Sequence, residues 1–102
     1  MTEHEPGSLA EHLHQQAVAN RDRTVEDWTT RARFARECRE LSEPLPAWST
    51  GELLAVAVIN EDQELLDQLD YTFHEALDRI RYDIGASLAV ATQIIASIRK
   101  ST

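Results

Sequence analysis

The segment from Ile84 to Ile98 has no charged side chain, although 27% of the residues in the chain are Asp, Glu, Lys or Arg. Its sequence, IGASLAVATQIIASI, is apolar or small on nearly every side of a helix. A helix of that kind must be buried by other structure. The segment is shorter than the about 20 apolar residues that span a bilayer. We therefore expect protein, and not lipid, to cover it.

The composition predicts one globular domain in a reducing compartment. The chain has 102 residues, 42% of them hydrophobic, with only three glycines and three prolines, so it can bury a core. Cys38 is the only cysteine, which excludes an intrachain disulfide. The first residues, MTEHEPGS, are acidic, and the apolar stretch of a secretion signal does not follow them. We predict a cytoplasmic protein without a membrane segment.

The charge is acidic and unevenly distributed. The net charge at pH 7 is −8, and residues 40–78 contain many acids but no lysine or arginine. Nucleic acid repels such a domain, so no nucleic acid partner is expected. The sequence has no glycine-rich phosphate loop, nucleophile elbow, HExxH or CxxC motif. We therefore predict that the chain is not an enzyme and has no catalytic, cofactor-binding or metal-binding residues.

Several helix N-termini are marked by residue pairs with the spacing of a capping box. In this motif a Ser or Thr hydroxyl accepts a hydrogen bond from the amide three residues on, and a Glu at that position bonds back to the cap. Each pair precedes a stretch with helical periodicity, which predicts an all-α fold. The pairs are Ser8 with Glu11, Ser49 with Glu52 and Thr72 with Glu75, and Thr24 with Asp27 is a weaker example.

We expect a single all-helical domain over residues 1–102 with four or five helices. The first two predicted helices could be fused, because neither Gly nor Pro separates them. Pro44 and Pro46 end the second, since proline lacks an amide donor and restricts the residue before it. The predicted elements are a flexible stretch at 1–7, helices at 8–20 and 24–41, a connector at 43–48, short helices at 53–59 and 65–69, and a last helix at 73–99.

The last predicted helix has apolar residues at steps of three and four from Leu77 to Ile98, the spacing of a coiled-coil seam. It would extend roughly 40 Å, whereas a compact domain of this size has a radius of gyration of about 13 Å. It should reach past its own domain or bend at Gly85. We expect a second copy to cover its free face in a helical-bundle homodimer; the alternative is a central helix wrapped by one chain. The predicted dimer interface is Ile84, Leu88, Ala91, Ile94, Ile95 and Ile98.

A run of acidic residues follows the connector and continues into the last helix. Residues 40–78 contain no lysine or arginine, so the run can serve as a docking surface that steers a basic protein toward the chain. The simpler interpretation is a solvated face that keeps the protein soluble. The predicted partner-binding surface consists of Glu61, Asp62, Glu64, Asp67, Asp70, Glu75 and Asp78.

An alternative function is that of a DNA-binding transcriptional regulator. Residues 63–83 have the pattern of two helices around a tight turn, as in a helix-turn-helix motif. The second helix would present His74, Glu75, Asp78 and Arg79 outward. Its two carboxylates would weaken binding to phosphates, so we predict the hairpin and rank DNA binding second.

The stretch WSTGELLAVAVINEDQELLDQLDYTFHEALDRIRYDIG, from Trp48 to Gly85, has a Trp-Ser-Thr-Gly-Glu opening, a Tyr71-Thr72 turn and a Glu-Ala-Leu-Asp-Arg helix. In these features it resembles short all-helical proteins of actinobacteria and their phages. The resemblance covers a little over a third of the chain. Those proteins are mostly of unknown function, so it carries over no functional residue. It implies an accessory or host-interaction protein, and we predict an acidic interaction module for a basic host protein.

Overall fold

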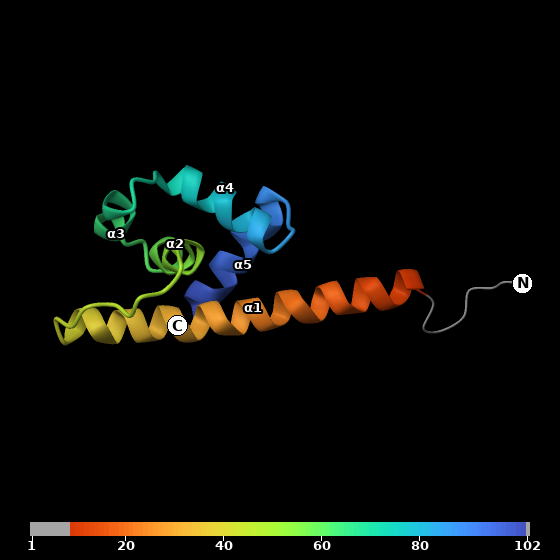
Figure 1. Cartoon of the computed structure of the whole chain (residues 1–102), viewed down its shortest axis with the longest axis horizontal. Helices are drawn as coiled ribbons and strands as arrows, with labels where there is room; N and C mark the ends of the chain where they lie inside the picture. Colours follow the sequence, from red (N-terminus) through yellow and green to blue (C-terminus); the bar gives the residue numbers. More distant parts are fainter. Residues whose placement is uncertain (1–8, 102) are drawn as a thin grey trace, which may run out of the picture.

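The structure is a computed structural model that describes residues 9–101, which form helices and no strand (Figure 1). The predicted all-α class is confirmed. α1 is a long rod, and the other four helices gather on one side of it. None of these helices combines the length and the apolar character that a membrane crossing requires. The helices are α1 (Leu9–Glu40), α2 (Thr50–Ile59), α3 (Gln63–Gln68), α4 (Phe73–Asp83) and α5 (Leu88–Ser101).

The short helix α2 is the centre of the fold, because it packs against each of the other four helices. All of its residues from Leu54 to Ile59 are buried. A helix enclosed on every side can be apolar all round, as the sequence of α2 is. The buried residues that surround it are Trp28, Ala32 and Ala35 of α1, Leu65 and Leu66 of α3, Ala76, Leu77 and Ile80 of α4, and Ala91, Ile95 and Ile98 of α5.

The two N-terminal helices predicted over 8–20 and 24–41 are one continuous helix in the structure. The 32 residues of α1 extend about 48 Å. The whole chain accordingly measures 62 × 25 × 24 Å along its principal axes. Thr24 lies inside α1, so the weaker prediction of a helix start there is wrong. Ser8, the predicted cap of the first helix, and residues 1–7 lie outside the described residues.

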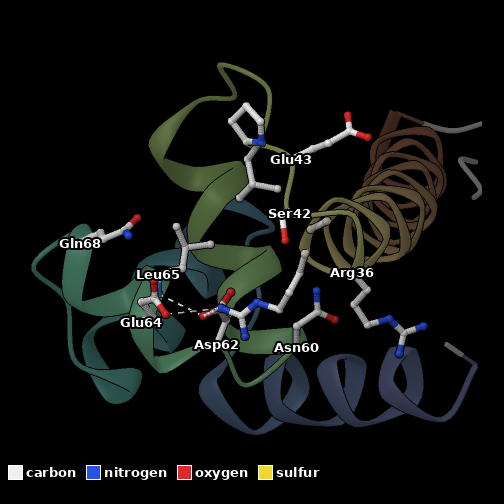
Figure 2. A pocket seen from close by; sticks show the side chains of 12 residues that line it. Arg36, Ser42, Glu43, Asn60, Asp62, Glu64, Leu65 and Gln68 are labelled. Carbon is white, nitrogen blue, oxygen red and sulfur yellow. Dashed lines mark hydrogen bonds and ion pairs between the residues drawn. The ribbon is translucent and has the colours of Figure 1, made fainter.

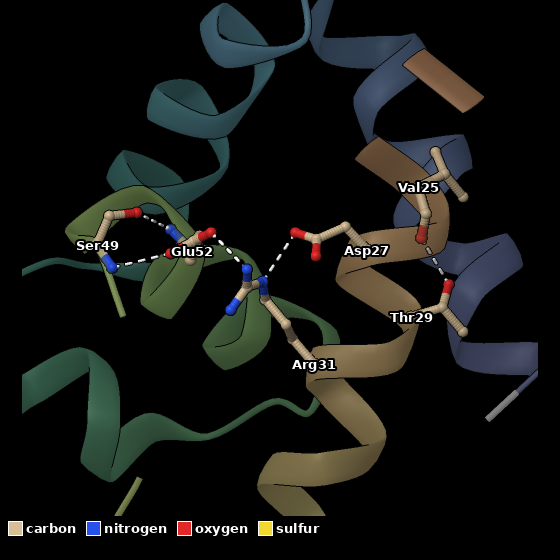
Figure 3. A network of polar contacts seen from close by, with 6 residues as sticks. All are labelled: Val25, Asp27, Thr29, Arg31, Ser49 and Glu52. Atoms are coloured by element: carbon tan, nitrogen blue, oxygen red, sulfur yellow. Dashed lines mark hydrogen bonds and ion pairs between the residues drawn. The ribbon is translucent and has the colours of Figure 1, made fainter. Parts of the chain in front are cut away.

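A polar network joins α1 to the start of α2 (Figure 3). Arg31 donates a hydrogen bond of 2.8 Å to Asp27 and lies 2.8 Å from the Glu52 carboxylate. Its guanidinium also lies over the Trp48 ring, 5.1 Å from the ring centroid. The hydrogen bond to Asp27 raises the pKa of Arg31, and the hydrogen bond from the Ser49 backbone lowers the pKa of Glu52. Arg31 therefore ties the end of the connector to α1.

The last predicted helix is two helices in the structure, so the prediction of one long C-terminal helix is wrong. α4 ends at Asp83 and α5 begins at Leu88. Between them, Gly85 has a φ of +62°, a left-handed conformation that glycine adopts without strain. The Ser87 hydroxyl then accepts a hydrogen bond of 3.2 Å from the Val90 amide and caps α5. The chain takes the bend that the sequence allowed at Gly85, and the bend is a complete break.

α1, α2, α3 and α4 end in the same backbone arrangement. The second residue after each helix takes a left-handed conformation, and two backbone amides donate hydrogen bonds to carbonyls of the last turn, as in a Schellman motif. This left-handed residue is a glycine only after α4. The others are Ser42 (φ 56°), Glu61 (φ 53°) and Asp70 (φ 62°). The breaks predicted between the helices, after residue 59 and after residue 69, are therefore confirmed.

Arg99 fastens α5 to the end of α2. Its Nε donates to the Ile59 carbonyl at 3.1 Å, and its Nη2 donates to the Val58 carbonyl at 2.7 Å. These carbonyls lie in the last turn of α2, where a cation is favourable. The guanidinium also lies 3.7 Å from the Glu61 carboxylate and 6.0 Å from the Phe73 ring centroid. The first charged residue after the charge-free segment thus holds that segment against the central helix.

Candidate functional site

The structure divides the predicted acidic surface into residues that are paired within the chain and residues that are not. Four of the seven carboxylates lie within 4 Å of an arginine nitrogen, although no basic residue is near them in the sequence except in one pair. Their negative charge is therefore used in part to hold the helices together. The pairs are Asp62 with Arg39 at 3.0 Å, Glu64 with Arg39 at 3.9 Å, Glu61 with Arg99 at 3.7 Å and Asp78 with Arg81 at 2.7 Å.

The other three acids, Asp67, Asp70 and Glu75, lie together where α3 turns into α4. With Tyr71 and Thr72 they line a hollow of about 230 Å³. Within residues 9–101, none of the three has a lysine or arginine at ion-pair distance. We call Asp67, Asp70 and Glu75 the acidic corner.

Local hydrogen bonds set the positions of these three side chains. Asp70 is the left-handed residue that ends α3. Thr72 accepts from the Glu75 amide at 3.1 Å, and Glu75 accepts from the Thr72 amide at 3.0 Å, which confirms the predicted capping box. The bond from the Thr72 backbone lowers the pKa of Glu75, so its carboxylate stays charged. Asp67 accepts a hydrogen bond of 2.8 Å from Gln63.

The chemistry of the acidic corner suits an organic cation. Three carboxylates that line one hollow can accept hydrogen bonds from a guanidinium or an ammonium group. Beside the hollow, the Tyr71 hydroxyl accepts a bond of 3.1 Å from Arg79, which holds the aromatic ring in place. Within the described part of the chain, no group of three or more His, Cys, Asp or Glu could hold a metal ion. A lysine or arginine side chain of another protein is the ligand class that fits.

A larger hollow of about 520 Å³ lies between the end of α1, the connector and α3 (Figure 2). Its walls carry charges of both signs, and Arg39 donates a hydrogen bond of 3.0 Å to Asp62. The amide of Asn60 belongs to the wall, and its Nδ2 donates to the Ala32 carbonyl at 3.0 Å. The Asn60 Oδ1 is buried without a partner in the described residues. Two arginines, Arg36 and Arg39, and three acids line this hollow, so a charged ligand of either sign would meet like charges there.

The predicted dimer interface is divided between core and surface. A partner chain that leaves the core intact can contact only those of the six residues that keep some exposure. Ala91, Ile95 and Ile98 are buried in the chain's own core, Ile84 and Ile94 are partly buried against it, and Leu88 is 37% exposed.

The hairpin predicted over 63–83 is present as α3, a tight turn and α4. α3 has only six residues. α4 exposes His74, Glu75 and Arg79, with Asp78 partly exposed. Because the acidic corner lies directly beside α4, a phosphate backbone that approached this helix would meet three unpaired carboxylates.

Sequence analysis missed the aromatic residues at the surface. Phe34 is 45% exposed and packs on Trp48 with 6.1 Å between ring centroids, and Tyr82 is 68% exposed. It also missed Tyr71 and Thr72 as part of the hollow. The capping-box spacing of Thr72 and Glu75 predicted a helix start at this place in the chain, but it gave no sign that the two residues line a hollow.

A comparison of the chain with protein families, with curated proteins and with solved structures finds no match. The functional argument therefore depends on the geometry and charge of the acidic corner.

Proposed function

We propose that this chain is a small helical interaction module that binds a basic protein through the acidic corner of Asp67, Asp70 and Glu75. One observation carries the proposal: the three carboxylates line one hollow, and within residues 9–101 none has a lysine or arginine at ion-pair distance. Unpaired charges of one sign steer an oppositely charged partner and orient it. The other four acids of the predicted surface each have an arginine within 4 Å, so the proposed binding surface narrows from seven residues to three.

A docking function and a purely solubilising role differ in whether the position of the removed charges matters. An acidic face that only keeps the protein soluble can lose charges at any exposed site with the same effect. A docking surface depends on the particular charges that meet the partner. Charge removal at the corner and charge removal elsewhere should therefore have different consequences for binding.

The biological setting of the proposal comes from the sequence. The likeness of Trp48 to Gly85 to helical proteins of actinobacteria and their phages supports an accessory protein that acts on a host protein. The single cysteine, Cys38, is free and buried, which is compatible with a reducing cytoplasm.

We also propose that the chain forms a homodimer. Leu88 is partly exposed at the start of α5, and Ile84 is partly exposed beside it. Symmetric dimers are the commonest assemblies of soluble proteins. The buried residues of α5 contribute to the core of each copy and not to the contact between copies.

The docking proposal can be tested with two variants of equal net charge. One replaces the acidic corner by Asp67→Asn, Asp70→Asn and Glu75→Gln, in which Gln keeps the capping box. The control replaces Glu26, Glu37 and Glu40, which are exposed on α1, by Gln. A partner is first captured from host lysate with the native chain, and its affinity for the three proteins is then measured by calorimetry. We expect the corner variant to bind about tenfold or more weakly and the control within about twofold.

Equal affinities for the two variants would contradict a docking function of the corner. The second candidate function is tested in the same experiment by adding DNA at low salt. Binding of native chain to DNA that increases in the corner variant would instead support the regulator with a hairpin at 63–83, since removal of the acids relieves phosphate repulsion.

A further inference from the structure

Large apolar side chains are exposed at the C-terminal end of α1 and beside it in the connector. Phe34 is exposed on the helix, and Leu41, directly after it, is 68% exposed. The Leu41 amide bonds to the Glu37 carbonyl at 3.0 Å, so the helical course continues to Leu41. Phe34 and Leu41 are seven residues apart and therefore lie on one side of the helix. Trp48, which is partly buried, packs on Phe34 from the connector. We call Phe34, Leu41 and Trp48 the apolar patch.

Two glutamates border the apolar patch. Glu37 lies between Phe34 and Leu41, three residues from the first and four from the second, and so shares their side of the helix. Glu43 is exposed in the connector, two residues after Leu41. Within residues 9–101, neither glutamate has a lysine or arginine at ion-pair distance. The patch therefore has negative charge at its rim.

The arginines four residues before these glutamates contact other parts of the chain. That spacing would allow an ion pair along the helix. Arg33 instead donates a hydrogen bond of 2.9 Å to the Ser101 carbonyl at the end of α5. Arg39 donates one of 3.0 Å to Asp62, before α3. The fold thus directs both guanidinium groups toward the other helices and leaves the rim of the patch acidic.

The charge at the rim selects among possible occupants of the patch. A second copy in a symmetric contact would bring the same glutamates together, because such a contact uses one surface on both copies. An anionic lipid surface would be repelled as well. A protein segment with large apolar side chains and basic residues beside them would complement both the patch and its rim.

We propose that the apolar patch binds a short segment of another protein in which large apolar side chains are flanked by lysine or arginine. The patch shares no residue with the acidic corner, so the inference goes beyond the function proposed above and does not rest on it. The apolar side chains supply most of the affinity, and the rim charges orient the segment and speed its association.

The experiment uses the full chain and a synthetic helical peptide with leucines at steps of three and four and lysines at the other positions. Leu41→Ser should weaken binding of this peptide about tenfold, because it removes an apolar contact and no charge. The matched control is Tyr82→Ser on α4, where the side chain is also 68% exposed, and its affinity should stay within about twofold. Since both side chains are exposed, both variants should keep the native circular dichroism and urea midpoint.

Tryptophan fluorescence locates the bound peptide. The peptide contains no tryptophan, and Trp28 is already buried in the core. Binding at the patch should therefore shift the emission to shorter wavelength through Trp48 alone. A saturable association that leaves the emission unchanged would place the peptide elsewhere and overturn the proposal.

The rim is tested through the salt dependence of binding. Glu37→Gln combined with Glu43→Gln should change the affinity within about twofold at about 150 mM NaCl, but it should reduce the loss of affinity on further addition of salt. A peptide with glutamate in place of lysine should bind at least about tenfold more weakly than the basic peptide. Equal binding of the two peptides would contradict a basic occupant.

The remaining outcomes separate the patch from other surfaces. Equal affinities of Leu41→Ser and Tyr82→Ser would overturn the patch. A loss of affinity in the variant Asp67→Asn, Asp70→Asn and Glu75→Gln, without a loss in Leu41→Ser, would assign the peptide to the acidic corner instead. In light scattering, a native dimer that becomes monomeric in Leu41→Ser would show that a second copy covers the patch, which also contradicts the proposal.

Discussion

Two apolar segments of this chain, α2 and the charge-free segment from Ile84 to Ile98, are buried in different ways. α2 is enclosed on every side, and its residues from Leu54 to Ile59 are all buried. In α5, which contains most of the charge-free segment, only Ala91, Ile95 and Ile98 are buried. Ala89, Thr92, Gln93, Ala96 and Ser97 of α5 are exposed.

The difference shows that absence of charge is a weaker predictor of burial than large apolar residues on every side. α2 has Leu, Val and Ile around its whole circumference, and each needs cover. Apart from Leu88 and Lys100, the exposed residues of α5 are small or uncharged and polar, and such residues tolerate water at little cost. The shorter of the two apolar segments, α2, is therefore the one that needs cover on every side, and it is the central helix.

The largest expected effect comes from placing the same charge in each helix. Ala57→Asp puts an unpaired carboxylate at a position with 0% exposure, which should cost more than about 4 kcal/mol and leave most of the chain unfolded. Ala96→Asp on the exposed side of α5 should cost about 1 kcal/mol or less. Urea denaturation followed by circular dichroism measures both. Similar losses of stability would mean that another surface covers the exposed side of α5.

The link between the two helices should have the next largest effect. Arg99→Met removes the hydrogen bonds to the last carbonyls of α2 but keeps an apolar stem, and we expect a loss of about 1–2 kcal/mol. The control Lys100→Met changes an exposed neighbour and should alter stability by less than about 0.5 kcal/mol. Urea midpoints provide the measurement. If both variants unfold at the native urea midpoint, the hydrogen bonds from Arg99 to α2 do not contribute to stability.

The two helix starts should differ by a smaller amount. Ser49→Ala removes the hydroxyl that accepts from the Glu52 amide in the capping box, and the loss should cost about 1 kcal/mol. Ser87→Ala removes the single bond at the start of α5, and we expect about 0.5 kcal/mol. Thermal melts of the two variants compare them directly. A greater loss of stability for Ser87→Ala than for Ser49→Ala would contradict the expected order of the two helix starts.

The smallest expected effect is a pH dependence at the start of α2. The hydrogen bond from the Ser49 backbone lowers the pKa of Glu52 in the folded state. Its contribution to stability is therefore complete above the ordinary glutamate pKa of about 4.3 and is lost as the pH falls through the lowered folded value. Glu52→Gln should flatten the decline of the urea midpoint below that pH, whereas Glu26→Gln on the exposed side of α1 should leave it unchanged. An identical decline in all three proteins would exclude this contribution.

The helix starts at the capping boxes and the helix ends near residues 41, 59 and 69 could be predicted from the sequence, but the end of α4 and the start of α5 could not. The capping boxes at Ser49 and Thr72 need only residues three apart, so a local pattern contains the whole signal. The ends of α1, α2 and α3 use Ser42, Glu61 and Asp70 in a conformation that usually indicates glycine. Gly85 was the one end with the usual residue, and helical periodicity on both sides of it concealed the break.

The sequence predicted an acidic surface, but it could not predict which three of its acids form the acidic corner. The sequence shows that the acids are there, but it does not show which arginines reach them. Asp62 is paired with Arg39, 23 residues away, so the pairing depends on how α1 lies against α3. The three acids of the corner became recognisable only because the structure shows an arginine within 4 Å of each of the other four.

The sequence by itself determined what depends on near neighbours along the chain: the helical class, the starts of α2 and α4, the connector and the acidic character of residues 40–78. Only the tertiary structure decided which apolar helix became the centre. Burial depends on what other helices present to each side of a segment, and that is a sum over contacts distant in sequence. The charge-free segment therefore covers one side of the core, while α2 fills its middle.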